Sequence, residues 1–372
     1  MYFAKNYEQS RRGFIQVVRW MQEKFPQSKL DSYLMPPDNK DELYTDVLYV
    51  PVQNSDTLIV VTSGVHGIEA YTGSAIQQSI LDRFFVNELP LKASLLFVHS
   101  VNPYGHKNFR RVNENNVDLN RNFLSNQDDF GTIINPSYQN LEAFLNNKVK
   151  FQSKLLEKTR FVFSTLKELK NYGIKSFRQA ILQGQYQFEK GIFFGGKDYQ
   201  AQRDLIDKLI DKYMLRYKRI VFIDIHTGYG YRGKLHLIGM DTYPDETVYE
   251  DLQALYPDDR IEKADAGQGD FYKINGAMFD YIYDKLTPKN IRVLPVAWEF
   301  GTNGNIRTLK SIDSLRIIRA ENQAFHYGCV DDKSKQKIKK EYRNLFYPDS
   351  DSWQRKVLEK AGITFEKLLN QL

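Results

Sequence analysis

The feature that most constrains the fold is an alternation of short, β-branched apolar runs with helical segments. Residues Thr57–Thr62 form one apolar run, residues Ala70–Phe85 have a helical pattern, and residues Ala93–His99 form a second apolar run. A strand, a helix and a strand in this order are typical of a parallel βαβ unit. The alternation therefore predicts an α/β fold built on a sheet.

The same alternation returns later in the chain, with a helix at Gln200–Tyr217 and a strand at Arg219–Ile225. A helix at Phe271–Lys285 and a strand at Ile291–Trp298 follow. The other predicted elements are an amphipathic helix at Arg11–Phe25, a strand at Val47–Val52 and a helix at Ile306–Phe325.

Residues 124–197 are polar and helical in pattern, and predict a helical insertion in the α/β fold. Residues 331–372 predict a helical C-terminal tail. No Pro-, Gly- or Ser-rich linker and no internal repeat divides the chain. We therefore expect one decorated domain that spans residues 1–372.

The composition, with 42% hydrophobic and 26% charged residues, favours an ordinary globular protein over a disordered chain. The net charge of +6 is spread out, apart from a basic cluster at Lys333–Lys340. Such a cluster is usually a solvated helix face. The alternative is a patch for nucleic acid or an acidic membrane, but no recognition module accompanies it, so no nucleic-acid partner is expected.

The cellular compartment is expected to be reducing, because Cys329 is the only cysteine. The first residues lack the pattern of a signal peptide, and no apolar run is long enough to cross a membrane. These features predict a cytoplasmic protein without a membrane partner. The sequence leaves the oligomeric state open.

The first chemical signal is the motif that begins at His66 and ends at Glu69, between a predicted strand and a predicted helix. Functional side chains collect at the carboxyl ends of parallel strands. A histidine and a glutamate three positions apart in a turn can share one Zn²⁺. Alone the spacing is weak evidence, because both residue types are common at helix starts.

The second signal is His226, which ends a predicted strand 226 − 66 = 160 residues after the first histidine. Zinc in hydrolases takes three protein ligands and keeps one position for water, so His66, Glu69 and His226 form a plausible open site. The remaining histidines have contexts that favour structural roles: His99, His106, His236 and His326.

The third signal is Glu299, which ends the predicted strand Ile291–Trp298 at the same sheet edge. A carboxylate buried there needs a reason, because burial without a partner is unfavourable. A general base beside an activated water would provide one. The alternative is a strand-end glutamate held in a salt bridge.

The fourth signal is a group of polar residues after the strand Ala93–His99: Asn102-Pro-Tyr-Gly105, Arg110-Arg111 and Asp118-Leu-Asn-Arg-Asn-Phe123. An arginine can stabilise an oxyanion, and an Asn/Arg pair offers donors for a substrate carboxylate. Ordinary surface pairing explains the same residue types equally well.

Taken together and in this order, these motifs resemble the zinc carboxypeptidase A-like family. The match runs from about Tyr44 to Phe325, and the His-Gly-Ile-Glu, Gly-Ile-Phe-Phe-Gly-Gly and Asp-Ile-His-Thr-Gly segments are similar to a little-characterised bacterial branch. The resemblance implies a mixed, mostly parallel sheet flanked by helices, one catalytic Zn²⁺ per chain and hydrolysis of an amide bond.

The resemblance also implies roles for individual residues. His66, Glu69 and His226 correspond to the zinc ligands, and Glu299 corresponds to the general base. Arg111 corresponds to the arginine that polarises the carbonyl, with Arg110 as an alternative. The remaining correspondences are Asn120 and Arg121, which grip a substrate carboxylate, and Asp118, which orients the first zinc histidine.

The chain departs from the family pattern at two points. Digestive members carry an arginine between the histidine and the glutamate, where this chain has Gly67 and Ile68. Those members also place a tyrosine over the substrate, for which Tyr272, Tyr281 and Tyr283 are candidates.

The expected function is hydrolysis of a peptide, with two alternatives. One is hydrolysis of an acyl-amino acid, as in the similar succinylglutamate desuccinylase and aspartoacylase branch. The other is a binding protein that keeps the fold without turnover, although the complete set of His66, Glu69, His226 and Glu299 argues against it.

Overall fold

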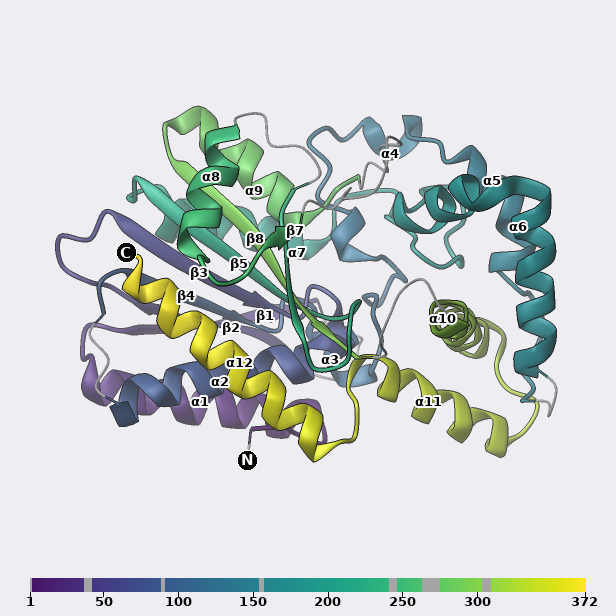
Figure 1. Cartoon of the computed structure of the whole chain (residues 1–372), viewed down its shortest axis with the longest axis horizontal. Helices are drawn as coiled ribbons and strands as arrows, with labels where there is room; N and C mark the ends of the chain where they lie inside the picture. The colour runs from purple at the N-terminus through teal and green to yellow at the C-terminus, as the bar shows by residue number, and fades with distance from the viewer. Residues whose placement is uncertain are drawn as a thin grey trace.

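A computed structural model describes residues 2–36, 42–87, 91–153, 157–240, 246–262, 275–302 and 309–372. Within these residues, eight strands form one sheet in the order β1-β2-β4-β3-β5-β8-β6-β7 (Figure 1). The strands are β1 (Lys29–Met35), β2 (Leu43–Val50), β3 (Thr57–Ser63), β4 (Ser94–His99), β5 (Arg219–Gly228), β6 (Leu235–Ile238), β7 (Ile261–Glu262) and β8 (Arg292–Gly301).

The sheet is mixed, with a parallel centre. Strands β4, β3, β5 and β8 run parallel to one another, whereas β2 pairs with β4 and β6 pairs with β8 in the antiparallel direction. β1 is antiparallel to β2, and β7 is parallel to β6. The predicted mixed sheet is confirmed, and its central parallel strands end at one common edge.

Helices flank this sheet, as predicted, and further helices lie beyond its end (Figure 1). They are α1 (Tyr7–Lys24), α2 (Ala70–Asn87), α3 (Pro103–Asn108), α4 (Asp129–Thr132), α5 (Pro136–Leu145), α6 (Glu157–Leu182), α7 (Ala201–Leu209), α8 (Glu246–Leu255), α9 (Met278–Leu286), α10 (Leu309–Tyr327), α11 (Asp332–Phe346) and α12 (Asp351–Asn370). α2 packs between α1 and α12, and contacts β3 and β4. No helix in the described ranges is long and apolar enough to cross a membrane.

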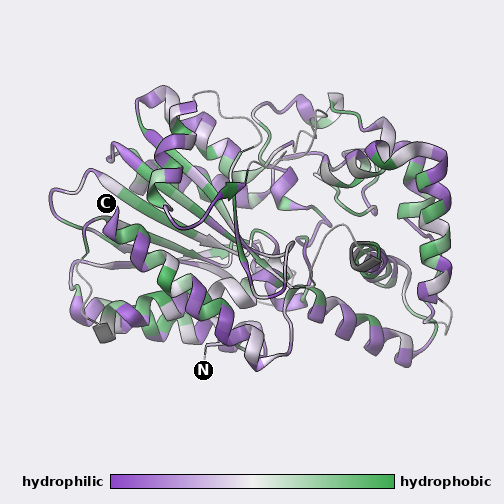
Figure 2. Cartoon of the chain, in the orientation of Figure 1, coloured by the Kyte–Doolittle hydropathy of each residue, from purple (hydrophilic) through white to green (hydrophobic). Residues whose placement is uncertain are grey.

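The main core lies between the sheet and these helices. The central strands are apolar along their length, as the green strands in Figure 2 show, and their side chains are almost entirely buried. α1 buries the apolar face that its sequence predicts, with Phe14, Val17, Val18 and Met21 inside. Parallel strands that are covered on both faces have such continuous apolar runs.

Residues 124–197 contain α4, α5 and α6, in agreement with the helical pattern of this region. In Figure 1, α5, α6 and α10 lie beyond the end of the sheet. They share a small core of their own, in which Leu141, Phe161, Phe177 and Leu315 are buried. Helices α5 and α6 of residues 124–197 thus pack largely on each other and on α10.

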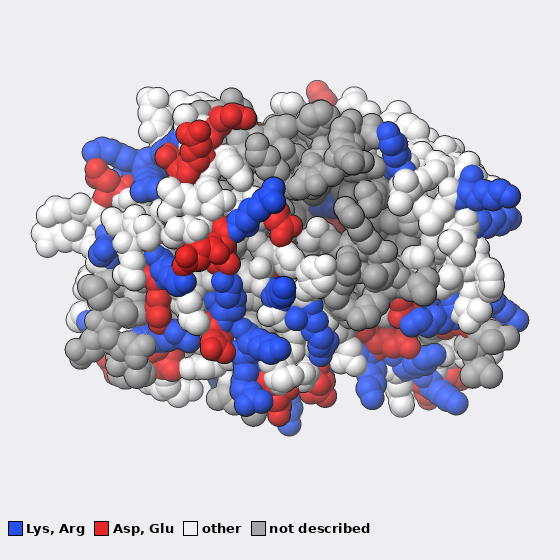
Figure 3. All heavy atoms as spheres, in the orientation of Figure 1, with Lys and Arg blue, Asp and Glu red and all other residues white. Residues whose placement is uncertain are grey.

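The last residues form α11 and α12, in agreement with the predicted helical tail. α11 exposes the lysines of Lys333–Lys340 and buries Ser334 and Ile338, so the basic cluster is a solvated helix face. Figure 3 shows basic side chains on this side of the molecule interspersed with acidic ones. α12 contributes Trp353 and Phe365 to the main core.

Some elements differ from the prediction. β1, β6 and β7 were not predicted; β1 mixes polar and apolar residues, and only its Met35 is buried. The helix predicted at Gln200–Tyr217 is α7 followed by a π-helical turn, η3 (Ile210–Met214). α9 accounts for the end of the helix predicted at Phe271–Lys285, whose first four residues lie outside the described ranges.

Candidate metal centre

Three neighbouring parallel strands deliver the predicted site residues to one edge of the sheet. β3 ends at Ser63 and leads into the turn that holds His66. β5 carries His226, and β8 carries Glu299 directly beside it in the register. The predicted convergence at the carboxyl ends of parallel strands therefore occurs.

The turn that follows β3 is fixed by close backbone packing. His66 precedes a short 3₁₀ helix, η1 (Gly67–Glu69), whose first amide N–H groups donate to the carbonyl oxygens of Arg111 and Arg110. A Cβ atom added at Gly67 would lie 2.2 Å from the carbonyl carbon of Gly105. Only glycine allows this approach, which links the His-Gly-Ile-Glu motif to the Asn-Pro-Tyr-Gly motif.

The donor atoms of His66, Glu69 and His226 all lie within 4.8 Å of one another, and the three residues are buried. His66 Nδ1 is 3.0 Å from Glu69 Oε1, and His226 Nδ1 is 3.2 Å from Glu69 Oε2. The two Nδ1 atoms are 3.3 Å apart. In the part of the chain that the structure describes, this is the one cluster of its kind.

The opposite nitrogen of each imidazole faces an aspartate. His226 Nε2 is 2.7 Å from Asp224 Oδ2, and His66 Nε2 is 3.2 Å from Asp118 Oδ1, although that second contact is poorly aligned for a hydrogen bond. Protons on both Nε2 atoms leave both Nδ1 lone pairs directed at the carboxylate of Glu69. Four such acceptors around one point repel one another unless protons or a metal cation lie between them, so the deprotonated donor set fits a metal ion.

The pKa values of these residues reflect their mutual charges. Burial opposes ionisation of Glu69 and Asp118, but the imidazole of His66 lowers the pKa of both carboxyls, and Arg111 lowers that of Asp118 further. Burial likewise opposes protonation of His226, but Asp224 and Glu69 raise its pKa well above the usual value. The site is thus rich in ionised carboxylate, which favours a cation.

Glu299 has a different environment. Burial and the nearby charge of Glu69 raise the pKa of Glu299 to about 8, and its Oε1 accepts a hydrogen bond of 2.9 Å from the amide of Tyr229. The side chain is only partly exposed. A carboxyl with such a pKa can take up and release a proton near neutral pH.

The two neighbouring arginines point to different partners. Arg111 Nε is 2.9 Å from Asp118 Oδ2, and its Nη1 is 3.5 Å from Glu69 Oε1. Arg110 instead donates to Glu321 at 2.9 Å and lies over the ring of Phe325. Arg111 therefore borders the metal-ligand cluster, and Arg110 does not.

Asn120 and Arg121 lie in the 3₁₀ turn η2 (Leu119–Arg121), directly after Asp118. Asn120 Oδ1 accepts a hydrogen bond from the amide of Met278, and Arg121 Nη1 donates to the carbonyl oxygen of Asn120. The Gly-rich segment 191–196 packs on this turn, because the amide of Asp118 donates to Phe194 O at 2.7 Å. The side chains of Asn120 and Arg121 are both buried.

The positions that depart from the family pattern are also buried. Gly67 packs on Gly105, and Ile68 lies in an apolar cluster with α10 and α11. Among the tyrosine candidates, Tyr281 and Tyr283 are buried in the main core, and the hydroxyl of Tyr281 donates to Asp207. Tyr272 lies outside the described residues.

The other four histidines stay apart from the metal-ligand cluster, as their contexts predict. His99 and His106 are fully buried and bond to Ser74 and Ser100, respectively. Two lie nearer the surface: His236, which pairs with Glu262 at 2.8 Å, and His326, whose Nε2 is buried.

Three further residues contact the metal-ligand cluster or Arg111: Asp224, Thr227 and Tyr342. The sequence predicted no role for them. Asp224 bonds His226 and accepts a 2.6 Å hydrogen bond from Thr62, and the amide of Thr227 donates to Glu69 Oε2 at 2.9 Å. Tyr342 of α11 accepts a hydrogen bond from the amide of Arg111. Only Asp224 had a signal in the sequence, since residues two apart on a strand share one face.

The chain is similar to several solved structures and matches the model of one protein family. No curated protein matches the sequence. A carboxypeptidase A from Helicoverpa armigera is 13% identical with a TM-score of 0.47, and the match covers 91% of this chain and 73% of that chain. A succinylglutamate desuccinylase from Chromobacterium violaceum is 12% identical with a TM-score of 0.41, over 87% of this chain and 77% of that chain.

The family model described as "Protein of unknown function (DUF2817)" matches residues 3–360 of the 372, and the chain therefore belongs to this family.

Proposed function

We propose that this protein is a zinc-dependent hydrolase of an amide bond. The observation that carries the proposal is the convergence of His66, Glu69 and His226 on one point, with an aspartate behind each histidine. Two imidazoles and one carboxylate are a common ligand set for catalytic zinc in hydrolases. Glu299, the expected base, lies beside His226 in the sheet register.

The bound ion would activate a water molecule and polarise the substrate carbonyl. Glu299 would accept a proton at its carboxylate from the attacking water and donate it to the leaving amine, and the amide of Tyr229 holds this carboxylate in place at 2.9 Å. Arg111 stabilises the oxyanion with its guanidinium. Asp118 binds Arg111 at 2.9 Å and so fixes its direction.

The substrate in this proposal carries a free carboxylate. Asn120 uses its carbonyl oxygen to hold Met278, which leaves its amide NH₂ group to donate to a substrate. Arg121 adds a cation beside it in the same turn. A peptide C-terminus is the first candidate, because the motifs resemble carboxypeptidases.

An N-acyl amino acid is the second candidate. Gly67 and Ile68 stand where digestive carboxypeptidases carry an arginine; Gly67 packs on Gly105, and Ile68 is buried in an apolar cluster. One carboxylate contact of those enzymes is thus missing. This difference favours a substrate that is held by fewer groups at its carboxylate.

Metal content and a substrate panel test the proposal together. Elemental analysis of the purified wild type is expected to give about one zinc per chain, and His66→Ala is expected to lose it. Dipeptides and acyl-amino acids assayed on the same samples separate the two candidate substrates. A wild type that binds no metal even after zinc is supplied would contradict the proposal and favour a binding role.

The role of Glu299 is tested by Glu299→Gln, which keeps the size of the side chain and removes the base. Turnover is expected to fall by about 10²–10⁴-fold with zinc content unchanged. Glu250→Gln, an exposed change on α8, is the matched control and is expected to keep wild-type turnover. Near-wild-type turnover of Glu299→Gln would show that another residue is the base.

A further inference from the structure

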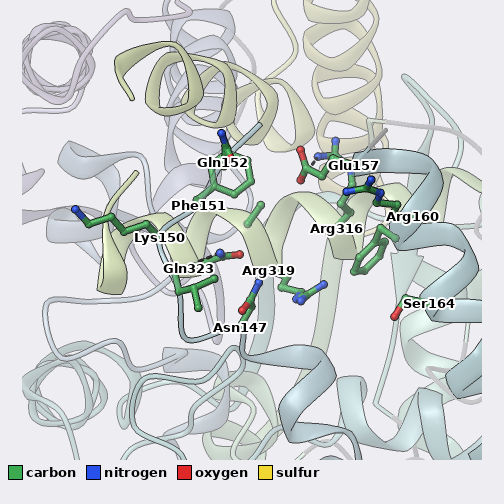
Figure 4. A pocket seen from close by; sticks show the side chains of 13 residues that line it. Asn147, Lys150, Phe151, Gln152, Glu157, Arg160, Ser164, Arg316, Arg319 and Gln323 are labelled. Carbon is green, nitrogen blue, oxygen red and sulfur yellow. Dashed lines mark hydrogen bonds and ion pairs between the residues drawn. The ribbon is translucent and has the colours of Figure 1, made fainter. Parts of the chain in front are cut away.

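A cavity lies between α6 and α10, away from the metal-ligand cluster. Its volume is about 440 Å³, which is within the range of pockets for small molecules. Figure 4 shows Arg316, Arg319 and Gln323 of α10 on one side and Arg160 and Ser164 of α6 on another. Asn147 and Lys150, from the segment after α5, complete the polar part of its lining.

Arg316 is neutralised within the protein. Its side chain is 6% exposed, and three carboxylates pair with it: those of Asp313 at 2.7 Å, Glu341 at 2.7 Å and Glu157 at 3.4 Å. Two of these carboxylates also pair with a lysine, at Lys158 and Lys337. Among the described residues of this network three cations and three carboxylates balance, and Glu157 is the one carboxylate among the described residues that line the cavity.

Arg319 is in the opposite situation. Its Nε is buried and has no hydrogen-bond partner, and in the described part of the chain no carboxylate pairs with its guanidinium. Its neighbours are the rings of Phe144 and Phe161, whose centroids are 5.4 and 5.3 Å from its Cζ. Arg319 is half-buried; burial lowers its pKa, and the nearby charge of Glu157 offsets part of that shift.

Aromatic rings alone do not account for this arginine. Aromatic rings stabilise a cation less than an anionic partner does, and the half-buried guanidinium of Arg319 keeps a buried Nε–H without an acceptor. Proteins therefore bury arginine with a carboxylate or a phosphate, which its planar fork binds with two hydrogen bonds. Here the partner is missing from the described residues, and a cavity lies where it would be.

The rest of the lining supports the same ligand charge. Lys150 and Arg160 are exposed at the cavity and form no ion pair in the described residues. With Arg319 they give the lining an excess of positive charge over Glu157, which pairs with Arg316 at 3.4 Å and also acts on Arg319. Phe151 and Phe161 add apolar surface. The cavity thus combines cations with a place for a small carbon skeleton.

We propose that this cavity is a binding site for a small organic anion, whose carboxylate or phosphate group is bound by Arg319. Arg160 and Lys150 attract the ligand electrostatically, and Asn147 and Ser164 lie in reach as polar partners at the cavity wall. The site is separate from the metal-ligand cluster, because the two share no residue.

Calorimetric titration of the full chain tests this proposal, with inorganic phosphate, acetate and benzoate as probes. Saturable binding of at least one probe is expected, and it should weaken at least tenfold in Arg319→Gln. Arg355→Gln, an exposed change on α12, is the matched control and should bind like the wild type. Tight binding of phosphate alone points to a phosphate ester, and tighter binding of benzoate points to an aromatic carboxylate.

Two further variants keep the test independent of folding and of the metal centre. Ser164→Trp places a bulky side chain at the cavity without removing a charge, and is expected to abolish binding even if Arg319→Gln does not fold. His66→Ala is expected to bind the probe unchanged. Absence of saturable binding for every probe, binding that survives both cavity variants, or binding lost in His66→Ala would overturn the proposal, whatever the hydrolysis assays show.

Discussion

At the scale of the residue, the candidate centre depends on both nitrogens of each histidine. His66 and His226 direct Nδ1 toward Glu69, and each directs Nε2 toward an aspartate. An aspartate at Nε2 fixes the tautomer and the ring orientation, and makes the other nitrogen a better ligand. The aspartates therefore contribute to metal binding without touching the metal.

Asp224→Asn is expected to lower zinc affinity by about 10–100-fold, because the amide holds His226 less firmly and stabilises the wrong tautomer. Competition with a chromophoric chelator measures the affinity. Asp251→Asn serves as the control, since Asp251 forms a half-exposed ion pair with Arg292. Equal zinc affinity of Asp224→Asn and wild type would contradict a supporting role for this aspartate.

His99 makes stability depend on pH. Its ring is fully buried and stacked on Phe14, and burial lowers the pKa of His99 to about 4. The unfolded chain therefore binds a proton below about pH 6.5 that the folded chain takes up only near pH 4. This group should remove about 3 kcal/mol of stability between pH 7 and pH 4.

The measurement is urea unfolding of wild type and His99→Gln at pH 7, 5 and 4. The variant is expected to be less stable at pH 7, because it loses the stacked ring, and to lose less stability on acidification than the wild type. The same loss in both proteins would show that His99 does not set this pH dependence.

At the scale of the element, short turns rather than helices position the ligands. η1 follows β3, and its amide groups bond to the segment that carries Arg110 and Arg111. The start of α3 then packs on this turn through Gly105. One set of backbone contacts thus aligns the ligand turn with the arginine that borders it.

Gly67→Ala is expected to displace this turn, because the new Cβ would overlap the backbone of Gly105 at 2.2 Å. Overpacking of this kind destabilises a fold by about 1–3 kcal/mol, and we expect zinc affinity to fall as well. Thermal unfolding and zinc titration measure the two effects. Gly131→Ala on α4 is the control, since its Cβ would meet nothing within 4 Å. Equal behaviour of the two variants would contradict the packing argument.

At the scale of the whole molecule, the end of the chain closes the main core. α12 packs on α2, and its Phe365 contacts the rings of Phe84, Phe97 and Trp298. Trp353 Nε1 donates to the carbonyl oxygen of Gly301 at the end of β8. The last helix therefore stabilises the strand that carries Glu299.

Phe365→Ala is expected to lower the free energy of unfolding by about 3–5 kcal/mol, because it leaves a cavity between α12 and the sheet. Ile363→Ala on the same helix is the control: its side chain is 39% exposed, and a change below about 1 kcal/mol is expected. Chemical denaturation measures both. A small effect of Phe365→Ala would mean that α12 is not part of the cooperative core.

The sequence by itself determined the order of the central strands and the residues that meet at the sheet edge. Apolar runs on covered strands are a local signal, as in β3, β5 and β8. Strand ends in a parallel sheet share one edge, so His66, His226 and Glu299 had to lie near one another. β1 lacked this signal because it has no continuous apolar run, and only its Met35 is buried.

Only the tertiary structure decided which side chains point to the centre and what supports them. Arg110 and Arg111 are adjacent in sequence, and their directions depend on Glu321 in α10 and Asp118 in η2. The unmatched charge of Arg319 likewise appears only when α6 and α10 are packed together. Side-chain direction and charge balance depend on contacts between distant segments, and a local sequence pattern does not contain them.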